Sequence, residues 1–141
     1  PRVHLAGRFQ QHAEFIFDVA HNKDGATVCA ATIAAVCPPR PCVALLSILG
    51  DKDWRGMMEV LAPVVDRFVL TLATTSPSNR AWDPAEARDE AVRRGWVAEI
   101  EPDFAAALQR ARSLGRTVLV TGSFHTVGDA MERLHLSPLA E

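Results

Sequence analysis

The sequence predicts a three-layer α/β domain with a mostly parallel sheet of about six strands, an antiparallel edge and helices on both faces. Apolar runs of strand length alternate with amphipathic helical patterns along the whole chain. This alternation is typical of parallel sheets built with right-handed crossovers. In addition, the run Val43–Leu49 is almost continuously apolar, as in a strand that is covered by helices on both faces.

The composition favours one soluble domain. The chain has 141 residues, of which 48% are hydrophobic and 23% charged, so it is long enough for a proper core and is not disordered. A net charge of -2 with scattered basic residues gives no long-range attraction for nucleic acid or anionic membranes. No apolar run reaches the length of a membrane span, and no signal-peptide pattern is present. We therefore expect a cytoplasmic protein.

The cysteines are consistent with a reducing compartment. The chain has three cysteines, so they cannot all pair with one another, and no Cys-x-x-Cys pattern occurs. They are Cys29, Cys37 and Cys42. They are expected to be reduced, with Cys29 and Cys37 filling the core from one helix.

The first third of the chain predicts a hairpin followed by a helix. Val3–Ala6 and the apolar run that ends at Val19 are short extended segments, and Arg8–Ala13 joins them as a loose hairpin. This hairpin is the expected antiparallel edge. A helix from about Lys23 to Val36 follows, with one apolar face, and a Pro-Pro pair then stops it. The residues assigned to that face are Ala26, Cys29, Ile33, Val36 and Cys37.

The middle third repeats the strand–helix unit. The strand Val43–Leu49 is followed by a helix that begins after Asp53, a good N-cap, and is apolar at helical spacing up to Pro63. A strand at 67–73 leads into a polar loop. Asp83 is predicted to be the N-cap of the next helix, with a proline in its first turn and with Glu86 at the position of a capping-box glutamate. This helix is expected to end near Gly95.

The last third completes the pattern. Trp96–Ile100 is a short strand, and the next helix opens at Pro102 and closes at Gly115. Thr117–Thr121 is the last clear strand. The final helix is apolar at i, i+3, i+4 and i+7; the residues are Val127, Ala130, Met131 and Leu134.

Polar side chains follow several of the predicted strands. Because the carboxyl ends of parallel strands share one edge, these groups should gather there, beside helix N-termini that favour phosphate or carboxylate. The groups are Asp18, His21 and Asn22, then Asp51 and Lys52, then Thr74–Arg80, and finally Ser123, Phe124 and His125.

Each of these residues also has a purely structural reading. Asp18 and Asn22 could cap a turn and a helix. His21 and His125 could be satisfied turn histidines, and because no third His or Cys accompanies them no metal site is predicted. Lys52 is either a solvated loop charge or an anion contact. Ser123 is an N-cap rather than a nucleophile on local pattern, since no Gly-x-Ser-x-Gly elbow surrounds it.

Two absent motifs limit the chemistry. No Gly-x-Gly-x-x-Gly follows a strand, which argues against a dinucleotide-binding domain. No Gly-x-x-x-x-Gly-Lys-Ser/Thr is present either, so the chain cannot cradle a triphosphate in the P-loop manner. We therefore expect the polar groups at the carboxyl edge of the sheet to form half of a site whose other half lies elsewhere. The start at Pro1 without a methionine agrees with a fragment or processed product.

Four motifs together resemble one family. Gly7–Gln10, Phe17–Asn22, Gly50–Asp53 and Gly122–Val127 occur in this order in the C-terminal domain of bacterial folylpolyglutamate synthase/dihydrofolate synthase, of the Mur ligase superfamily. The resemblance covers nearly the whole chain and implies that residues 1–141 are a single Rossmann-like domain of the Mur ligase C-terminal, or glutamate-ligase, type. The sequence departs from the family pattern at Lys23 and Ala6, where proline is common.

The resemblance implies an enzyme activity. In the family, ATP phosphorylates a substrate carboxylate, and the amino group of L-glutamate attacks the acyl phosphate to form an amide. An N-terminal P-loop domain, absent from this chain, would carry the phosphate loop and the Mg²⁺ ligands, so the isolated domain should be inactive. Dihydropteroate, folate or both would be the acceptor. The residues assigned by motif are Arg8, Asp18 (through the ribose) and Asn22 for ATP; His21, Lys52 and Ser123 for catalysis; and Ser123, Phe124 and His125 for substrate.

Two alternatives remain at this level. The chain could belong to another Mur-type ligase, one that extends cell-wall peptides or cyanophycin. It could also be a non-catalytic α/β module that binds a partner or a small anion. Lys23 falls in the first turn of its helix, where its charge opposes the dipole, and we expect it to tolerate that small cost rather than to reach a ligand phosphate.

Overall fold

A six-stranded sheet in the order β1-β2-β6-β3-β4-β5 forms the centre of the molecule. The structure is a computed structural model, and it describes residues 8–136. The β1–β2 pair is antiparallel and all the other neighbours are parallel, which confirms the predicted mostly parallel sheet with an antiparallel edge. The strands are β1 (Gln10–His12), β2 (Phe15–Asp18), β3 (Cys42–Leu46), β4 (Arg67–Leu70), β5 (Ala98–Ile100) and β6 (Thr117–Thr121).

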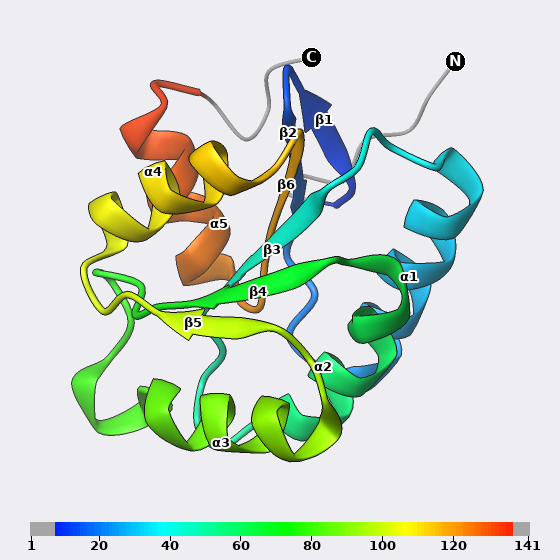
Figure 1. Cartoon of the computed structure of the whole chain (residues 1–141). Helices are drawn as coiled ribbons and strands as arrows, with labels where there is room; N and C mark the ends of the chain where they lie inside the picture. Colours follow the sequence, from blue (N-terminus) through cyan, green and yellow to red (C-terminus); the bar gives the residue numbers. More distant parts are fainter. Residues whose placement is uncertain (1–7, 137–141) are drawn as a thin grey trace.

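Helices cover both faces of this sheet (Figure 1). Three of them, α1, α2 and α3, pack in one apolar layer, and α4 and α5 pack in the other. The predicted three-layer α/β architecture is therefore confirmed. The helices are α1 (Lys23–Val36), α2 (Trp54–Leu61), α3 (Pro84–Arg94), α4 (Phe104–Leu114) and α5 (Phe124–Arg133), with short 3₁₀ turns η1 (Ala62–Val64) and η2 (Ser78–Arg80).

The central strands are apolar on both faces because both faces are covered. Along β3, Val43 and Leu45 belong to the layer under α4 and α5. The alternate residues Ala44 and Leu46 belong to the layer under the other three helices. Successive strand side chains point to opposite faces, so a strand at the middle of this sheet must be apolar at every position.

Each of the five α-helices begins at a residue whose side chain accepts a hydrogen bond from a backbone amide in the first turn. Such a cap satisfies a donor that the helix itself leaves unpaired. The capping residues are Asn22, Asp53, Asp83, Asp103 and Ser123. All five caps lie at the carboxyl edge of the parallel strands, directly before the helices that follow β2, β3, β4, β5 and β6, and the sequence therefore holds this edge in a defined shape.

The hairpin and one cysteine differ from expectation. Strand β1 lies within the segment predicted as the hairpin connection, and the turn falls at Ala13–Glu14; the predicted strand Val3–Ala6 lies outside the described residues. Cys37 is exposed in a left-handed conformation at the end of α1, so it is not core filler. Val36 is likewise exposed, and Ala30 takes a place on the buried face instead.

Some predicted boundaries and contacts were also wrong. Strands β3, β4 and β5 are shorter than predicted, because their flanking residues leave the ladder to form the loops at the sheet edges. Glu86 does not close a capping box on its own helix; its carboxylate instead accepts from Arg55 at 2.7 Å. The expectation that Lys23 tolerates its unfavourable place in the helix dipole is not contradicted, since Lys23 pairs with Glu59 of α2 at 3.6 Å.

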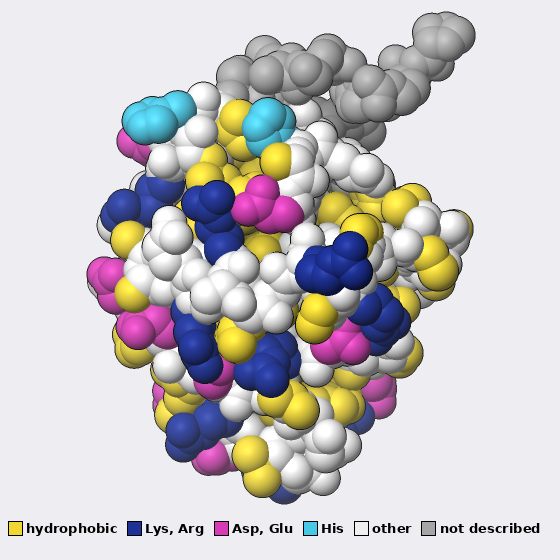
Figure 2. All heavy atoms as spheres, turned by 45° about the horizontal axis from the view of Figure 1, so that its top comes forward, with side chains coloured by type: hydrophobic (Ala, Val, Ile, Leu, Met, Phe, Trp, Pro, Cys, Tyr) yellow, Lys and Arg dark blue, Asp and Glu magenta, His cyan; other side chains and the backbone are white. Residues whose placement is uncertain are grey.

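The surface carries charges of both signs. On the face drawn in Figure 2, basic and acidic side chains lie interspersed with small apolar patches. Within residues 8–136, none of the helices combines the length and the apolar character that crossing a bilayer requires.

Candidate functional site

The strands β2 and β6 end side by side at the carboxyl edge of the sheet. Asp18 is the register partner of Thr121, whose hydroxyl donates to the Asp18 carbonyl at 2.5 Å. The chain leaves β2 for α1 on one face of the sheet and leaves β6 for α5 on the other face. In open α/β sheets, ligands bind in the crevice at such a switch point.

A cavity of about 200 Å³ lies at this switch point. Its polar wall comes from the segment after β2, and its apolar wall includes Val28 of α1 and Phe124 of α5, residues that are 57% and 63% exposed. Exposed apolar side chains beside a buried carboxylate suit a ligand that has a flat apolar part and a polar part. The lining residues are Arg8, Asp18, Val19, Ala20, His21, Asn22, Gly25, Val28 and Phe124.

Asp18 is a buried carboxylate with two backbone partners. Its Oδ1 accepts from the Ala20 amide at 2.9 Å and its Oδ2 from the Phe9 amide at 3.2 Å. Burial raises the pKa of Asp18 above its ordinary value, against the opposing effects of these two amides and of the Arg8 charge. Each carboxylate oxygen can accept more than one hydrogen bond, so both oxygens retain capacity for a ligand donor.

Asn22 and Gly25 shape the floor of the cavity. The Asn22 side chain accepts from the Gly25 amide at 2.8 Å and so caps α1. This confirms that Asn22 is a cap, and it also fixes the turn that carries the neighbouring polar residues. The N-terminus of a 14-residue helix therefore opens onto the cavity, where it favours negative charge.

His21 lies between the turn and α5. Its Nδ1 is 3.3 Å from the Val19 carbonyl oxygen, and its ring centroid is 5.6 Å from that of Phe124. A carbonyl oxygen only accepts hydrogen bonds, so this contact requires the proton on Nδ1 and leaves Nε2 as the acceptor of the neutral ring. His21 and Phe124, which are 103 positions apart in the sequence, thus form one wall.

Ser123 supports the site from inside. It is 3% exposed, and its hydroxyl oxygen accepts from the Thr126 amide at 3.1 Å and contacts the Thr126 hydroxyl at 2.9 Å. Thr126 in turn donates to the Ser47 carbonyl at 2.6 Å. In this structure Ser123 is the N-cap of α5, and it ties the turn after β6 to the segment that follows β3.

Lys52 and His125 lie on the same edge but do not line this cavity. Lys52 belongs to the turn after β3, where its amide donates to the Leu49 carbonyl at 3.1 Å. The Nδ1 of His125 is 3.3 Å from the Thr75 hydroxyl in the loop after β4. The structure therefore brings together five of the eight residues assigned from the sequence, namely Arg8, Asp18, His21, Asn22 and Phe124, and leaves Lys52, Ser123 and His125 around them.

Sequence reasoning missed several members of the edge. Val28, which lines the cavity, was not assigned to the predicted buried face of its helix. An apolar residue outside that face was the one sequence signal that could have pointed to it. Two hydrogen bonds join separate segments of the chain, one from the Phe9 amide to Asp18 and one from the Thr75 hydroxyl to Asp129. Nothing in the local sequence pattern indicates either of them. Within residues 8–136, no group of three or more His, Cys, Asp or Glu side chains is placed to hold a metal ion.

The sequence model of one family, described as "Mur ligase, glutamate ligase domain", matches residues 2–124. The chain belongs to this Mur ligase family. The Mur ligase domain is also similar to the dihydrofolate synthase/folylpolyglutamate synthase of Escherichia coli, with 33% identity in an alignment 136 residues long that covers 91% of this chain and 30% of the relative. The corresponding Mycobacterium tuberculosis enzyme is 41% identical over 64 residues, which are 45% of this chain and 13% of the relative.

Solved structures agree with the sequence comparison. The Mur ligase domain superposes on the Mycobacterium tuberculosis folylpolyglutamate synthase complexed with ADP and AMPPCP with a TM-score of 0.83 and 34% identity, covering 96% of this chain and 34% of that one. An Escherichia coli structure in complex with DHPP and ADP gives a TM-score of 0.81 and 31% identity, over 93% and 31% of the two chains. The resemblance to the C-terminal domain of these enzymes is confirmed. The chain spans about a third of their length.

Proposed function

We propose that this chain is the C-terminal domain of an ATP-dependent carboxylate–amine ligase that adds L-glutamate to dihydropteroate, to (tetrahydro)folate, or to both, through an acyl-phosphate intermediate. The membership of the Mur ligase family and the names of its relatives support this proposal. The observation that carries it is the cavity at the switch point between β2 and β6, where Asp18 and the N-terminus of α1 meet exposed Val28 and Phe124.

The residues of this cavity fit a nucleotide. Val28 offers apolar surface to a base, and the remaining acceptor capacity of Asp18 suits two ribose hydroxyls. Arg8 lies close enough to Asp18 to lower the pKa of that carboxyl, and its permanent charge and fixed donors suit a phosphate. We assign the binding of ATP to Arg8, Asp18 and Asn22. ATP, when bound, supplies the phosphoryl group that activates the acceptor carboxylate.

The other rim residues act on the reacting groups in this proposal. The transferred phosphate and the incoming glutamate are contacted by the side chains of His21 and Lys52. Ser123 acts on the same groups by fixing the start of α5. Phe124 and His125 contact the amino-acid substrate. Positioning and charge stabilisation are the main means of catalysis in such transfers, so a domain without a nucleophile contributes by closing over the substrates.

The divalent metal would be held outside this chain. A Yersinia pestis relative was solved with AMPPNP and a Mn ion, and another structure of that enzyme with Mn, AMPPNP and L-glutamate. The described residues contain no cluster of three metal-binding side chains. We therefore assign the Mg²⁺ ligands and the phosphate-binding loop to a separate N-terminal domain, and we expect the 141-residue chain alone to be inactive. The three free cysteines agree with a cytoplasmic location.

An assay of the complete enzyme tests this function. Glutamate- and ATP-dependent release of phosphate would be measured with dihydropteroate, with tetrahydrofolate and with a cell-wall peptide precursor. We expect turnover with one or both pteridine acceptors and none with the cell-wall precursor. Turnover with the precursor alone would reassign the chain to a cell-wall ligase, and no turnover with any acceptor would favour a non-catalytic module.

A further inference from the structure

Thr75 joins the loop after β4 to helix α5 through a single carboxylate. Its backbone amide donates to Asp129 Oδ2 at 3.1 Å, and its hydroxyl donates to Asp129 Oδ1 at 2.9 Å. Asp129 is only 6% exposed, and no ion pair to it occurs among residues 8–136. Both oxygens of a nearly buried carboxylate are thus used to hold one residue that lies 54 positions away.

His125 completes this cluster. It precedes Asp129 by four residues in α5, so the two side chains lie on the same face one turn apart. Its Nδ1 is 3.3 Å from the same Thr75 hydroxyl oxygen. The hydroxyl of Thr75 therefore bridges the two side chains of α5.

The chemistry of a hydroxyl fixes the direction of these bonds. An ionised carboxylate only accepts, so the single hydrogen of the Thr75 hydroxyl goes to Asp129. The hydroxyl oxygen can then only accept from His125, which requires the proton of the neutral ring to be on Nδ1. We propose that Asp129 and Thr75 are positioning residues that hold His125 in its Nδ1-protonated tautomer and leave Nε2 as the hydrogen-bond acceptor of the ring.

This assignment gives His125 a defined role if the function proposed above holds. Glutamate carries an ammonium group, which donates hydrogen bonds and does not accept them. A neutral ring with its lone pair on Nε2 can receive that group, whereas the opposite tautomer would present an N–H to it. The role in substrate binding rests on the proposed function; the tautomer itself does not.

Nuclear magnetic resonance of the 141-residue chain tests the tautomer directly. The chain would be labelled with ¹⁵N-histidine and studied at about pH 8, where an ordinary histidine is neutral. A His125→Gln variant would identify the signals of His125 among the five histidines. We expect Nδ1 to be protonated and Nε2 to be unprotonated. A wild-type spectrum with the proton on Nε2 would overturn the proposal without any further variant.

Three substitutions test whether Thr75 is the cause. Thr75→Val removes the hydroxyl at constant shape and should move His125 to the Nε2-protonated form, which an unrestrained histidine prefers. Thr75→Ser keeps the hydroxyl and should keep the wild-type tautomer. Thr74→Val, in the neighbouring residue of the same loop, should change nothing. An unchanged His125 tautomer in folded Thr75→Val would refute the proposal that Thr75 and Asp129 set this tautomer. If that variant does not fold, the spectra of the wild type and of Thr75→Ser decide.

Kinetics of the complete enzyme test the consequence. Thr75→Val should raise the KM for glutamate several-fold and leave the KM for ATP unchanged, and Thr75→Ser should restore the wild-type value. A general loss of folding would change both constants together. An active enzyme whose glutamate KM does not respond would refute the role in substrate binding. An enzyme inactive with every acceptor would refute the proposed function and leave the tautomer standing.

Discussion

At the scale of single residues, Asp18 is the observation that most favours a ligand site at this edge. A carboxylate in a buried position is costly unless hydrogen bonds compensate it, and burial does raise the pKa of Asp18. The two backbone amides on it leave acceptor capacity on the carboxylate oxygens. A purely structural cap could use an exposed side chain instead, as Asp53 and Asp83 do.

We expect Asp18→Ala to impair the use of ATP in the complete enzyme. The change removes the acceptor that we assign to the ribose, and the loss of a charge-assisted hydrogen bond corresponds to an increase of about tenfold or more in the KM for ATP. Steady-state kinetics with varied ATP would measure it. Asp24→Ala is the matched control, because Asp24 is an exposed carboxylate in the first turn of α1. An unchanged KM in Asp18→Ala would remove this residue from the site.

The sequence was sufficient for residues whose role is local. Asn22, Asp53 and Asp83 were each identifiable as a helix cap, because the residue type and the following pattern lie within four positions. The partner of Asp129 could not be found in this way. Its contact with Thr75 depends on how the loop after β4 meets α5, and a one-dimensional pattern does not contain that information.

At the scale of elements, the turn from β6 to α5 depends on one glycine. Gly122 has a φ of 121°, and a Cβ there would collide with the backbone carbonyl of Ser47. We expect Gly122→Ala to lower the free energy of unfolding by about 2 kcal/mol or more, because the side chain meets both a strained backbone and a fixed neighbour. Urea unfolding of the 141-residue chain would measure the loss.

Gly128 is the control for this prediction, since it lies within α5 and a Cβ there would have no atom within 4 Å. Gly128→Ala should raise the free energy of unfolding by about 0.5–1 kcal/mol, the difference in helix propensity between the two residues. Equal stability of the two alanine variants would contradict the account of the turn.

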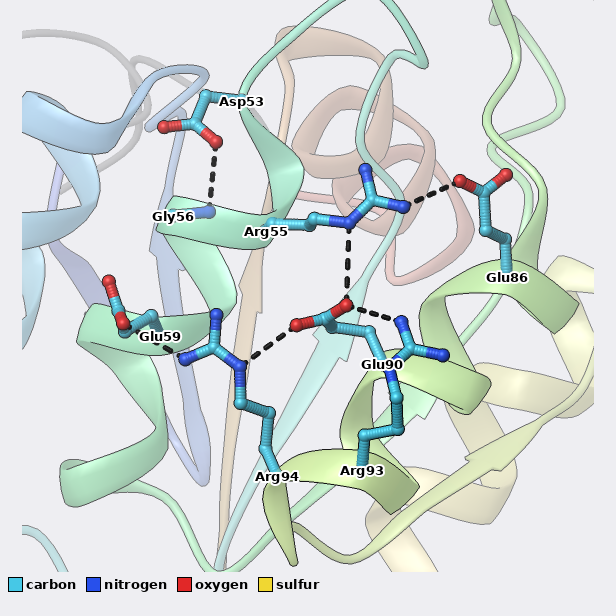
Figure 3. Close-up of polar contacts among 8 residues, drawn as sticks. All are labelled: Asp53, Arg55, Gly56, Glu59, Glu86, Glu90, Arg93 and Arg94. Atoms are coloured by element: carbon cyan, nitrogen blue, oxygen red, sulfur yellow. Dashed lines mark hydrogen bonds and ion pairs between the residues drawn. The ribbon is translucent and has the colours of Figure 1, made fainter.

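The contact between α2 and α3 centres on another carboxylate. Glu90 accepts from Arg93 at 2.6 Å, from Arg94 at 2.8 Å and from Arg55 at 3.4 Å (Figure 3). The hydrogen bond from Arg93, followed by that from Arg94, lowers the pKa of Glu90. A lowered pKa means that the ionised carboxylate stabilises the fold above the unfolded-state pKa. This contribution is lost as the pH falls through the folded-state value.

We therefore expect Glu90→Gln to lower the melting temperature by a few degrees at neutral pH. The difference from wild type should shrink as the pH falls below about 4, because protonated Glu90 resembles glutamine. Thermal unfolding at several pH values would show this convergence. Asp89→Asn, in an exposed neighbour on the same helix, removes one negative charge without the ion pairs and should have little effect. A difference independent of pH would exclude the ion pairs as its cause.

Elements with a strong pattern were predicted well, and those with a weak pattern were not. The bounds of α1 and β6 agree with the prediction, because each has clear periodicity and a definite stop. Strand β1 consists of Gln10, Gln11 and His12, which carry no strand signal; pairing with β2 alone makes them extended. Val36 and Cys37 were placed in the core because the helical period continues past the point where the sheet still covers the helix.

At the scale of the whole molecule, the gathering of the polar groups follows from the topology. All strands from β2 to β6 are parallel, so the alternation of strand and helix was enough to predict one shared edge. The insertion of β6 between β2 and β3 was not predictable, since it depends on how the last crossover packs. This insertion places Asp18 beside the turn that carries Ser123 and creates the switch point.

The same topology predicts that this domain binds nucleotide weakly alone. The described cavity offers a carboxylate, one helix N-terminus and apolar walls, but the sequence contains no loop that could cradle a triphosphate. We expect the isolated chain to bind ATP with a Kd of about 1 mM or weaker. Ligand linkage then limits the stabilisation by 1 mM ATP to about 0.4 kcal/mol, and calorimetric titration should show no saturation at micromolar ATP. The complete enzyme should bind ATP much more tightly, because the proposed N-terminal domain would add its phosphate-binding loop to the same molecule. Micromolar binding by the isolated chain would show that this domain holds the whole nucleotide site and would remove the need for a second half.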